Sequence, residues 1–278
     1  MTILNEFKLN RNFGLDLLRS FSIWLVLLQH AGINLSGLQP LKIGGIGVEI
    51  FFVLSGYLIG NIIFNDLKKG NSLIPTLKQF WFRRWLRILP LYYIVLFLKF
   101  IFLDNSIGWN IFYYIFFLQN NFFGISFLEV SWSLVIEEWF YLFSPIFLFL
   151  SKKFLKTTFK ILVAILCFIL LINALRLFYV IIGNVPYQGV NSNPPFRFDS
   201  LFLGVLLAFL KENYVDFFNK MTRPFVFAVG LIMMTFYLFI FWNLSTPINM
   251  INSIIWIKTL GFFILPFTFI RNFLIIAT

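Results

Sequence analysis

The chain has 278 residues, of which 60% are hydrophobic and only 12% are charged, and its mean hydropathy is +0.89. Soluble domains carry roughly 25% charged residues, so this composition excludes an ordinary soluble enzyme. The net charge of +11 would suit a nucleic-acid partner. However, the positive side chains lie in short stretches between apolar runs, so we assign them to membrane orientation and anion binding and expect no nucleic acid.

Apolar runs long enough to cross a bilayer as helices recur along the chain. We therefore predict an all-α, polytopic transmembrane bundle of about 8–9 spans, as a single integral membrane domain over residues 1–278 with no soluble domain. The predicted spans are 15–34, 44–64, 88–104, 132–150, 158–182, 198–210, 224–242 and 252–270.

The first span combines two unusual polar residues in an apolar stretch. In "RSFSIWLVLLQH", Arg19 begins the segment and His30, the only histidine of the chain, ends it. They lie roughly 16 Å apart along a helix. The polar N-terminus makes a poor signal peptide, so we expect a retained first span. Arg19 has one alternative interpretation, an interfacial pair with Asp16 one turn before it.

Lysine and arginine orient the spans. Loop 64–87, "SKKFLK" at 151–156 and the segments near Lys211 and Arg271 are basic, whereas the intervening loops are poor in positive charge. This pattern places the N-terminus in the cytoplasm, provided that 108–123 does not cross. We therefore expect 108–123, rich in Trp and Tyr, to be a re-entrant or interfacial segment on the outer side.

With this orientation, several ionisable residues fall at similar depth in the outer half of the membrane. Each costs roughly 2.5 kcal/mol or more at mid-bilayer and by default marks function. Adjacent Glu137 and Glu138 point about 100° apart on a helix, so they should face different surroundings. Asp199 could instead cap a helix. The outer set is His30, Glu49, Glu137, Glu138, Arg197 and Asp199.

Other features have simpler interpretations. Gly56 and Gly60, one turn apart, suit close helix packing. The single Cys167 excludes an intrachain disulfide, and with one histidine we expect no metal site. The residues alone leave two classes open: an enzyme that uses an imidazole with a carboxylate, and a proton-coupled or anion transporter.

Five motifs in one order add a resemblance over roughly residues 14–210. They are "LDLLRSFSIWLVLLQH", "GGIGVEIFFVLSGYLI", "FWFRRWLRILPLYY", "SWSLVIEEWFYLFSP" and "FRFDSLFLGVLLA". The chain thereby resembles membrane acyltransferase family 3, the multi-span O-acetylases of bacterial surface polysaccharides. The resemblance implies an Arg–ten residues–His signature, here Arg19 and His30, with the histidine as the catalytic base. It also implies an acyl-CoA donor and an extracytoplasmic sugar acceptor.

The sequence departs from the family pattern in three places. Glu49 stands where aspartate is commoner, and Trp139 replaces the usual glutamine. The family usually continues for two further helices with a "SYxxYLxH"-like motif, so we expect a chain that is short at its C-terminus. A transporter of acyl or sugar groups and a truncated, inactive paralogue therefore remain as alternatives.

These observations together predict an O-acyltransferase of the bacterial inner or plasma membrane, with its active site in the extracytoplasmic half. It would move an acyl group, acetyl by expectation, from acyl-CoA to a hydroxyl of a glycan or lipid-linked sugar, with no permanently bound cofactor. We assign a catalytic role to His30, Glu137 and Glu138. We assign donor binding to Arg19, Arg83, Arg84 and Arg87. We assign acceptor binding to Glu49, Arg197 and Asp199.

Overall fold

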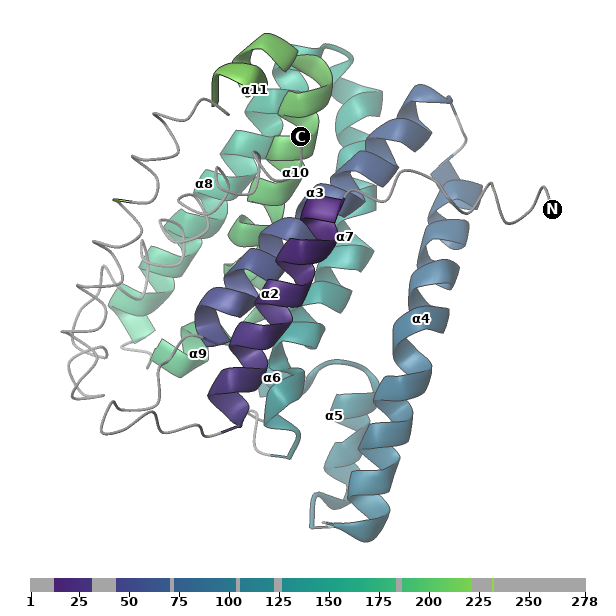
Figure 1. The fold of residues 1–278 in the computed structure, drawn as a ribbon, viewed down its shortest axis with the longest axis vertical. Coiled ribbons are helices and arrows are strands. Elements are labelled where there is room, and N and C mark those ends of the chain that lie inside the picture. Colours follow the sequence, from purple (N-terminus) through teal and green to yellow (C-terminus); the bar gives the residue numbers. More distant parts are fainter. Residues whose placement is uncertain are drawn as a thin grey trace.

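The computed structural model describes residues 13–31, 44–70, 73–103, 106–122, 127–183, 187–221 and 232 (Figure 1). Within these ranges every regular element is a helix. The predicted spans 224–242 and 252–270 lie outside the described residues, apart from residue 232. The all-α prediction is therefore confirmed for the described part, whereas the number of spans stays a prediction.

The described residues form helices from the first range to the last. They are α2 (Phe13–His30), α3 (Gly44–Lys68), α4 (Leu73–Phe102), η1 (Gly108–Asn110), α5 (Ile111–Ile115), α6 (Gln119–Phe122), η2 (Glu129–Ser131), α7 (Trp132–Leu155), α8 (Thr158–Gly183), α9 (Tyr187–Asn191), η3 (Pro194–Arg197), α10 (Phe198–Asn213) and α11 (Val215–Met221). Among the residues that the structure describes, four segments are long and apolar enough to cross a membrane: Gly44–Lys68, Ile74–Phe102, Glu129–Leu155 and Thr158–Gly183. The chain is a multi-pass membrane protein.

The basic stretch at 64–87 is not a loop, and this prediction was wrong. Helix α3 continues to Lys68 and α4 begins at Leu73, so most of the stretch is helical. Leu, Lys, Gln and Arg are good helix formers, and Pro75 lies in the first turn, where a missing N–H is tolerated. The arginines that follow are therefore on a rigid helix.

The segment 108–123 does not cross as one helix, as predicted. It forms η1, α5 and α6, none longer than 5 residues. The hydroxyls of Tyr92 and Tyr93 on α4 donate to the carbonyls of Tyr114 and Ile115, at 2.9 and 3.0 Å. These bonds hold α5 beside one end of α4 (Figure 1).

Helices α3 and α10 cross at the centre of the bundle with their backbones in close approach. A Cβ on Gly56 would overlap the carbonyl of Leu201, and one on Gly60 would lie 2.9 Å from the Ala208 Cβ. On α10, a Cβ on Gly204 would overlap the carbonyl of Val53. The prediction that Gly56 and Gly60 serve close packing is confirmed.

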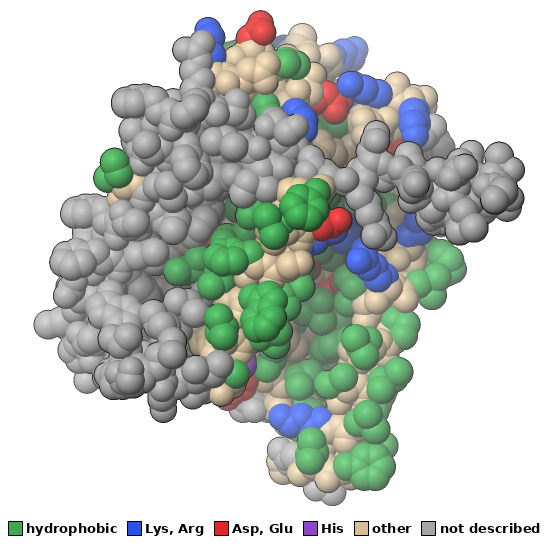
Figure 2. Space-filling view, viewed as in Figure 1, with side chains coloured by type: hydrophobic (Ala, Val, Ile, Leu, Met, Phe, Trp, Pro, Cys, Tyr) green, Lys and Arg blue, Asp and Glu red, His purple; other side chains and the backbone are tan. Residues whose placement is uncertain are grey.

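Positive charge gathers at one end of the molecule. Figure 2 shows blue side chains mainly toward the end at which α3 ends, α4 begins and α11 lies. There Lys68 pairs with Glu212 at 2.8 Å, and the Lys152 Nζ donates to the Leu67 carbonyl at 2.9 Å. This asymmetry supports the predicted cytoplasmic position of that end, which itself stays a prediction.

Candidate active site

His30 ends α2 with its ring held in one tautomer. Its Nδ1 lies 2.8 Å from the carbonyl oxygen of Val26, one turn earlier. A carbonyl only accepts hydrogen bonds, so Nδ1 carries the proton and donates it. In the neutral ring, Nε2 then has the free lone pair. The exposed imidazole is thus arranged as a base at Nε2.

A pocket of about 180 Å³ adjoins His30. Faces of α2 and α3 form its sides, with Trp132 and Ser133 from the start of α7. The Asn120 side-chain amide donates to the carbonyls of Trp132 and Ser192, at 3.0 and 2.8 Å, and so fixes this end of α7. The pocket therefore offers a reactant an aromatic wall and a hydroxyl close to the imidazole.

Glu137 lies one turn further along α7 than Ser133, on the same face. It is buried, and Tyr141 donates to its Oε2 at 2.7 Å while Ser55 donates to its Oε1 at 3.4 Å. The guanidinium of Arg84 lies 4.6 Å from the centre of the Tyr141 ring. Glu137 is thus linked through Tyr141 to an arginine of α4.

Three of the four predicted donor-binding arginines lie in one region. Arg19 pairs with Asp16 at 3.5 Å, as its alternative interpretation expected, and also lies within electrostatic range of Arg84 and Arg87. Like charges from two helices repel unless an anion lies between them, so the group suits a polyanion such as a phosphate chain. Arg83 is exposed and points about 100° away from Arg84 on the helix.

Glu138 faces other surroundings than Glu137, as the helical angle predicted. Its carboxylate is buried and lines a second pocket between α4, α5 and α7, where Trp85 is within hydrogen-bonding reach. Neither glutamate is placed against His30 by a hydrogen bond among the described residues.

The predicted acceptor-binding residues are engaged with each other. Glu49 forms an ion pair with Arg197 and accepts a bond from Ser200 at 2.8 Å. Asp199 pairs with Arg176 at 2.9 Å, and both side chains are fully buried. Asp199 does not cap α10: the N-cap position is Arg197, without a side-chain capping bond.

This paired cluster reaches the His30 pocket through aromatic rings. The Arg197 guanidinium lies 5.7 Å from the centre of the Phe52 ring, and Phe52 meets Trp132 edge to face at 6.3 Å. Both rings line the pocket. In this conformation the cluster supports the pocket wall from behind and does not line it with charge.

Sequence reasoning missed several participants. Arg176 is a charged residue inside an apolar span, so the rule that selected Glu49 could have found it. Tyr141 and Ser55 carried no such signal, because a lone hydroxyl in an apolar helix is common. Trp85 was not selected because it lies between the arginines of the basic motif, which drew the functional assignment.

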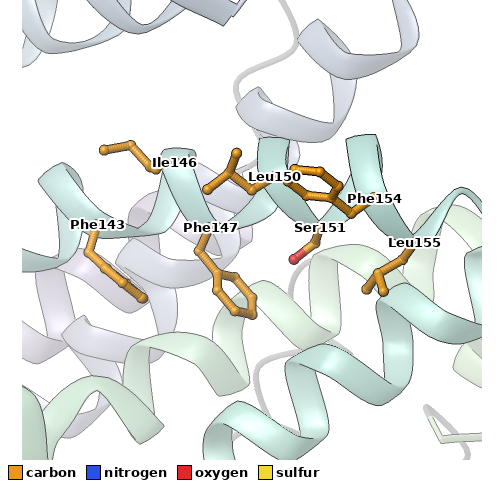
Figure 3. Close-up of a pocket in the computed structure, with 7 residues that line it drawn as sticks. All are labelled: Phe143, Ile146, Phe147, Leu150, Ser151, Phe154 and Leu155. Carbon is orange, nitrogen blue, oxygen red and sulfur yellow. The ribbon is translucent and has the colours of Figure 1, made fainter.

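A larger apolar groove on α7, of about 330 Å³, is an unsuitable site for chemistry (Figure 3). All seven side chains that line it come from α7, and only Ser151 among them is polar. None is titratable, so it offers neither a base nor an anion-binding group.

A family model described as an acyltransferase domain matches residues 12–277, so the chain belongs to acyltransferase family 3. It is 33% identical over 218 residues to the peptidoglycan O-acetyltransferase OatA of Listeria monocytogenes, covering 71% of this chain and 33% of that protein.

Two further relatives are candidate enzymes of the same kind. YrhL of Bacillus subtilis, a candidate peptidoglycan O-acetyltransferase, is 32% identical over 184 residues, or 59% of this chain and 28% of its own. A candidate O-acetyltransferase of Staphylococcus aureus is 32% identical over 215 residues, which cover 71% of this chain and 34% of the relative. The chain thus spans about a third of the length of these relatives. No solved structure matches.

Proposed function

We propose that the chain is an integral membrane O-acyltransferase that moves an acyl group, acetyl by preference, from acyl-CoA to a hydroxyl of an extracytoplasmic glycan. One observation carries this proposal. The chain's only imidazole presents a basic Nε2 beside a pocket at one end of α2, and an arginine group suited to phosphates lies toward the other end.

The arginine group would bind the donor. Guanidinium groups bind phosphates in bidentate fashion, and coenzyme A carries three phosphate groups at one end. Arg19 and His30 lie roughly 16 Å apart along α2, a span that suits the extended arm between these phosphates and the thioester. The donor would enter from the basic, cytoplasmic end.

The chemistry needs one proton transfer in each direction. His30 Nε2 takes the proton of the acceptor hydroxyl, and the oxygen attacks the thioester carbonyl. The C–S bond then breaks, the imidazolium returns the proton to the thiolate, and the products are an acyl ester and free coenzyme A. Glu137 acts at the donor side, because its bond to Tyr141 fixes the ring on which Arg84 lies.

The acceptor would be a sugar hydroxyl of the cell envelope. Trp132 offers an aromatic face to a sugar ring, and Ser133 offers a polar partner in the same pocket. The Listeria relative is named a peptidoglycan O-acetyltransferase, so we propose a cell-wall glycan as the acceptor class. Glu49, Arg197 and Asp199 would support the pocket and not bind the sugar themselves.

The experiment compares envelope glycans from cells with the chain, without it, and with His30→Ala. Mass spectrometry should show an added acyl mass only with the intact chain, accompanied by release of free coenzyme A in membrane vesicles. Transport of an acyl or sugar group without covalent change would favour the transporter alternative. Glycans that are identical in all three strains would indicate an inactive paralogue.

A further inference from the structure

The second pocket, between α4, α5 and α7, combines apolar and aromatic walls with one buried carboxylate. It measures about 250 Å³, and its walls are almost entirely apolar or aromatic, with Trp85, Leu89 and Tyr93 from α4 and Trp139 from α7. The one carboxylate among its lining residues is that of Glu138.

Glu138 is only 3% exposed, and its Oε1 has no hydrogen-bond partner among the described residues. A buried acceptor without a hydrogen-bond partner destabilises the protein, and more so when the acceptor is charged. The oxygen therefore calls for an N–H or O–H donor from outside the described chain. Because Glu138 is one of the residues that line the pocket, that donor would come from whatever fills the pocket.

The charges around the pocket limit which kind of ligand group can donate to Glu138. A carboxylate repels an anionic ligand group, and Arg84, which lies within electrostatic range of Glu138, disfavours an organic cation. A neutral amide or hydroxyl on a mostly apolar chain satisfies both conditions, and its apolar part matches the aromatic walls.

We propose that this pocket holds the pantetheine arm of the acyl-CoA donor, with Glu138 accepting a hydrogen bond from an amide or hydroxyl of the arm. The pantetheine arm carries two amide N–H groups, one hydroxyl and a dimethyl-substituted carbon. It starts at the phosphates, and Arg84, which we assign to the phosphates, directly precedes the pocket residue Trp85 on α4. The inference rests on the proposed function, since it assumes this donor.

The two adjacent glutamates then have different functional roles. Glu137 contacts Tyr141 and Ser55 and positions Arg84. Glu138 binds substrate directly. This assignment differs from a catalytic role for both, and it makes Glu138 important for donor affinity.

The test measures binding to the full chain in detergent or nanodiscs, with no turnover. The two probes are coenzyme A and its nucleotide portion alone, which is ADP with a phosphate on the ribose. The variants are Glu138→Leu and Glu138→Gln, with Glu129→Gln as a matched control because Glu129 is exposed and lies outside the pocket.

Glu138→Leu should weaken coenzyme A binding about tenfold or more, with Glu138→Gln intermediate because its amide retains a carbonyl acceptor. The nucleotide portion should bind equally or more tightly, since the loss of a nearby carboxylate leaves Arg84 less neutralised. The unliganded melting temperature of Glu138→Leu should not fall, because the substitution removes an unsatisfied buried group.

Equal coenzyme A affinity in the wild type and Glu138→Leu would overturn the inference and leave the proposed function standing. A parallel loss of both probes would also overturn it, since it would indicate general damage to the site. If the wild-type chain binds neither probe, the donor assignment under the proposed function fails together with this inference.

Discussion

At the scale of single residues, a side chain's neighbours decide its role more than its type does. Arg19, Arg84 and Arg197 are all arginines near or within the membrane-spanning part. Arg197 is fully buried and paired with Glu49, whereas Arg19 is 37% exposed and lies close to other arginines. The paired arginine suits a structural role, and the exposed like-charged group suits an anionic ligand.

His30→Ala should lower acyl transfer by about 10²–10⁴-fold, because general-base catalysis contributes about this much. Membrane insertion and melting temperature should stay unchanged, since the imidazole is exposed and its hydrogen bond within the described part of the chain is to its own helix. Acyl transfer to glycan in vesicles is the measurement. Transfer at the wild-type rate by this variant would remove His30 from the mechanism.

Arg84→Ala should raise the apparent KM for acyl-CoA far more than Arg83→Ala does. Arg84 lies over Tyr141 and within reach of Arg19, whereas Arg83 is exposed on another side of α4. A lost bond to a charged group costs about 1.5–3 kcal/mol, which is roughly 10- to 100-fold in affinity. Equal effects of the two substitutions would mean that the motif serves only membrane orientation.

At the scale of helices, α3 is the element around which the site is built. One of its faces packs against α10 through glycines, another lines the His30 pocket, and Ser55 bonds to Glu137. By contrast, only 11% of the most apolar stretch of α4 is buried inside the molecule, whereas 67% of the corresponding stretch of α3 is buried. Arg84 and Arg87 thus lie on a helix with little burial inside the molecule, whereas α3, which lines the His30 pocket, is buried over most of its apolar length.

Gly56→Ala should destabilise the protein, whereas Gly45→Ala should not. A Cβ on Gly56 would overlap the Leu201 carbonyl, which is backbone and cannot move aside, but a Cβ on Gly45 meets nothing within 4 Å. Overpacking costs about 1–3 kcal/mol, so the melting temperature in detergent should fall only for Gly56→Ala. An unchanged melting temperature would show that α3 and α10 can separate at little cost.

The buried pair of Glu49 and Arg197 should behave as a unit. Glu49→Leu and Arg197→Leu should each cost about 3–5 kcal/mol, because each removes the ion-pair partner of a buried charge. The double substitution should cost less than the sum of the two. Unfolding in detergent measures the cycle, and strict additivity would contradict the pairing.

At the scale of the whole molecule, much of the architecture was predictable and most of the pairing was not. Apolar runs predicted the starts of α3, α7, α8 and α10 at the observed residues, because burial in hydrocarbon leaves a continuous signal. The first 15 residues of α4 were missed, since a basic helix that lies largely outside the core has no apolar run.

In the candidate site, too, some features could be predicted from the sequence and others could not. The separation of Arg19 and His30 along one helix and the different surroundings of the two glutamates follow from helical rise and angle, which are local properties. The pairing of Asp199 with Arg176, and of Arg84 with Tyr141, joins separate helices. Such partners depend on how helices cross, which no spacing within one motif specifies.

The sidedness of the whole molecule can be tested with single cysteines in a Cys167→Ser background, because Cys167 is exposed. Ser106 follows α4 and Lys69 follows α3, at opposite ends, and both are exposed. An impermeant thiol reagent on whole cells should label Ser106→Cys and spare Lys69→Cys, while a permeant reagent labels both. The opposite pattern would place His30 at the cytoplasmic face and contradict the proposed route of the donor.

The crossing of α3 and α10 also restricts how such a sequence can diverge. Gly56 faces the backbone of α10 at Leu201 and Gly204 faces the backbone of α3 at Val53, so a side chain at either position must be accompanied by a shift of one helix. The outward residues of α4, such as Leu91, Ile94 and Leu98, face no such restriction, because hydrocarbon accepts any apolar shape. Substitutions should therefore accumulate fast along the outer surface of α4 and almost never at the two glycines, a contrast that an alignment of relatives would display directly.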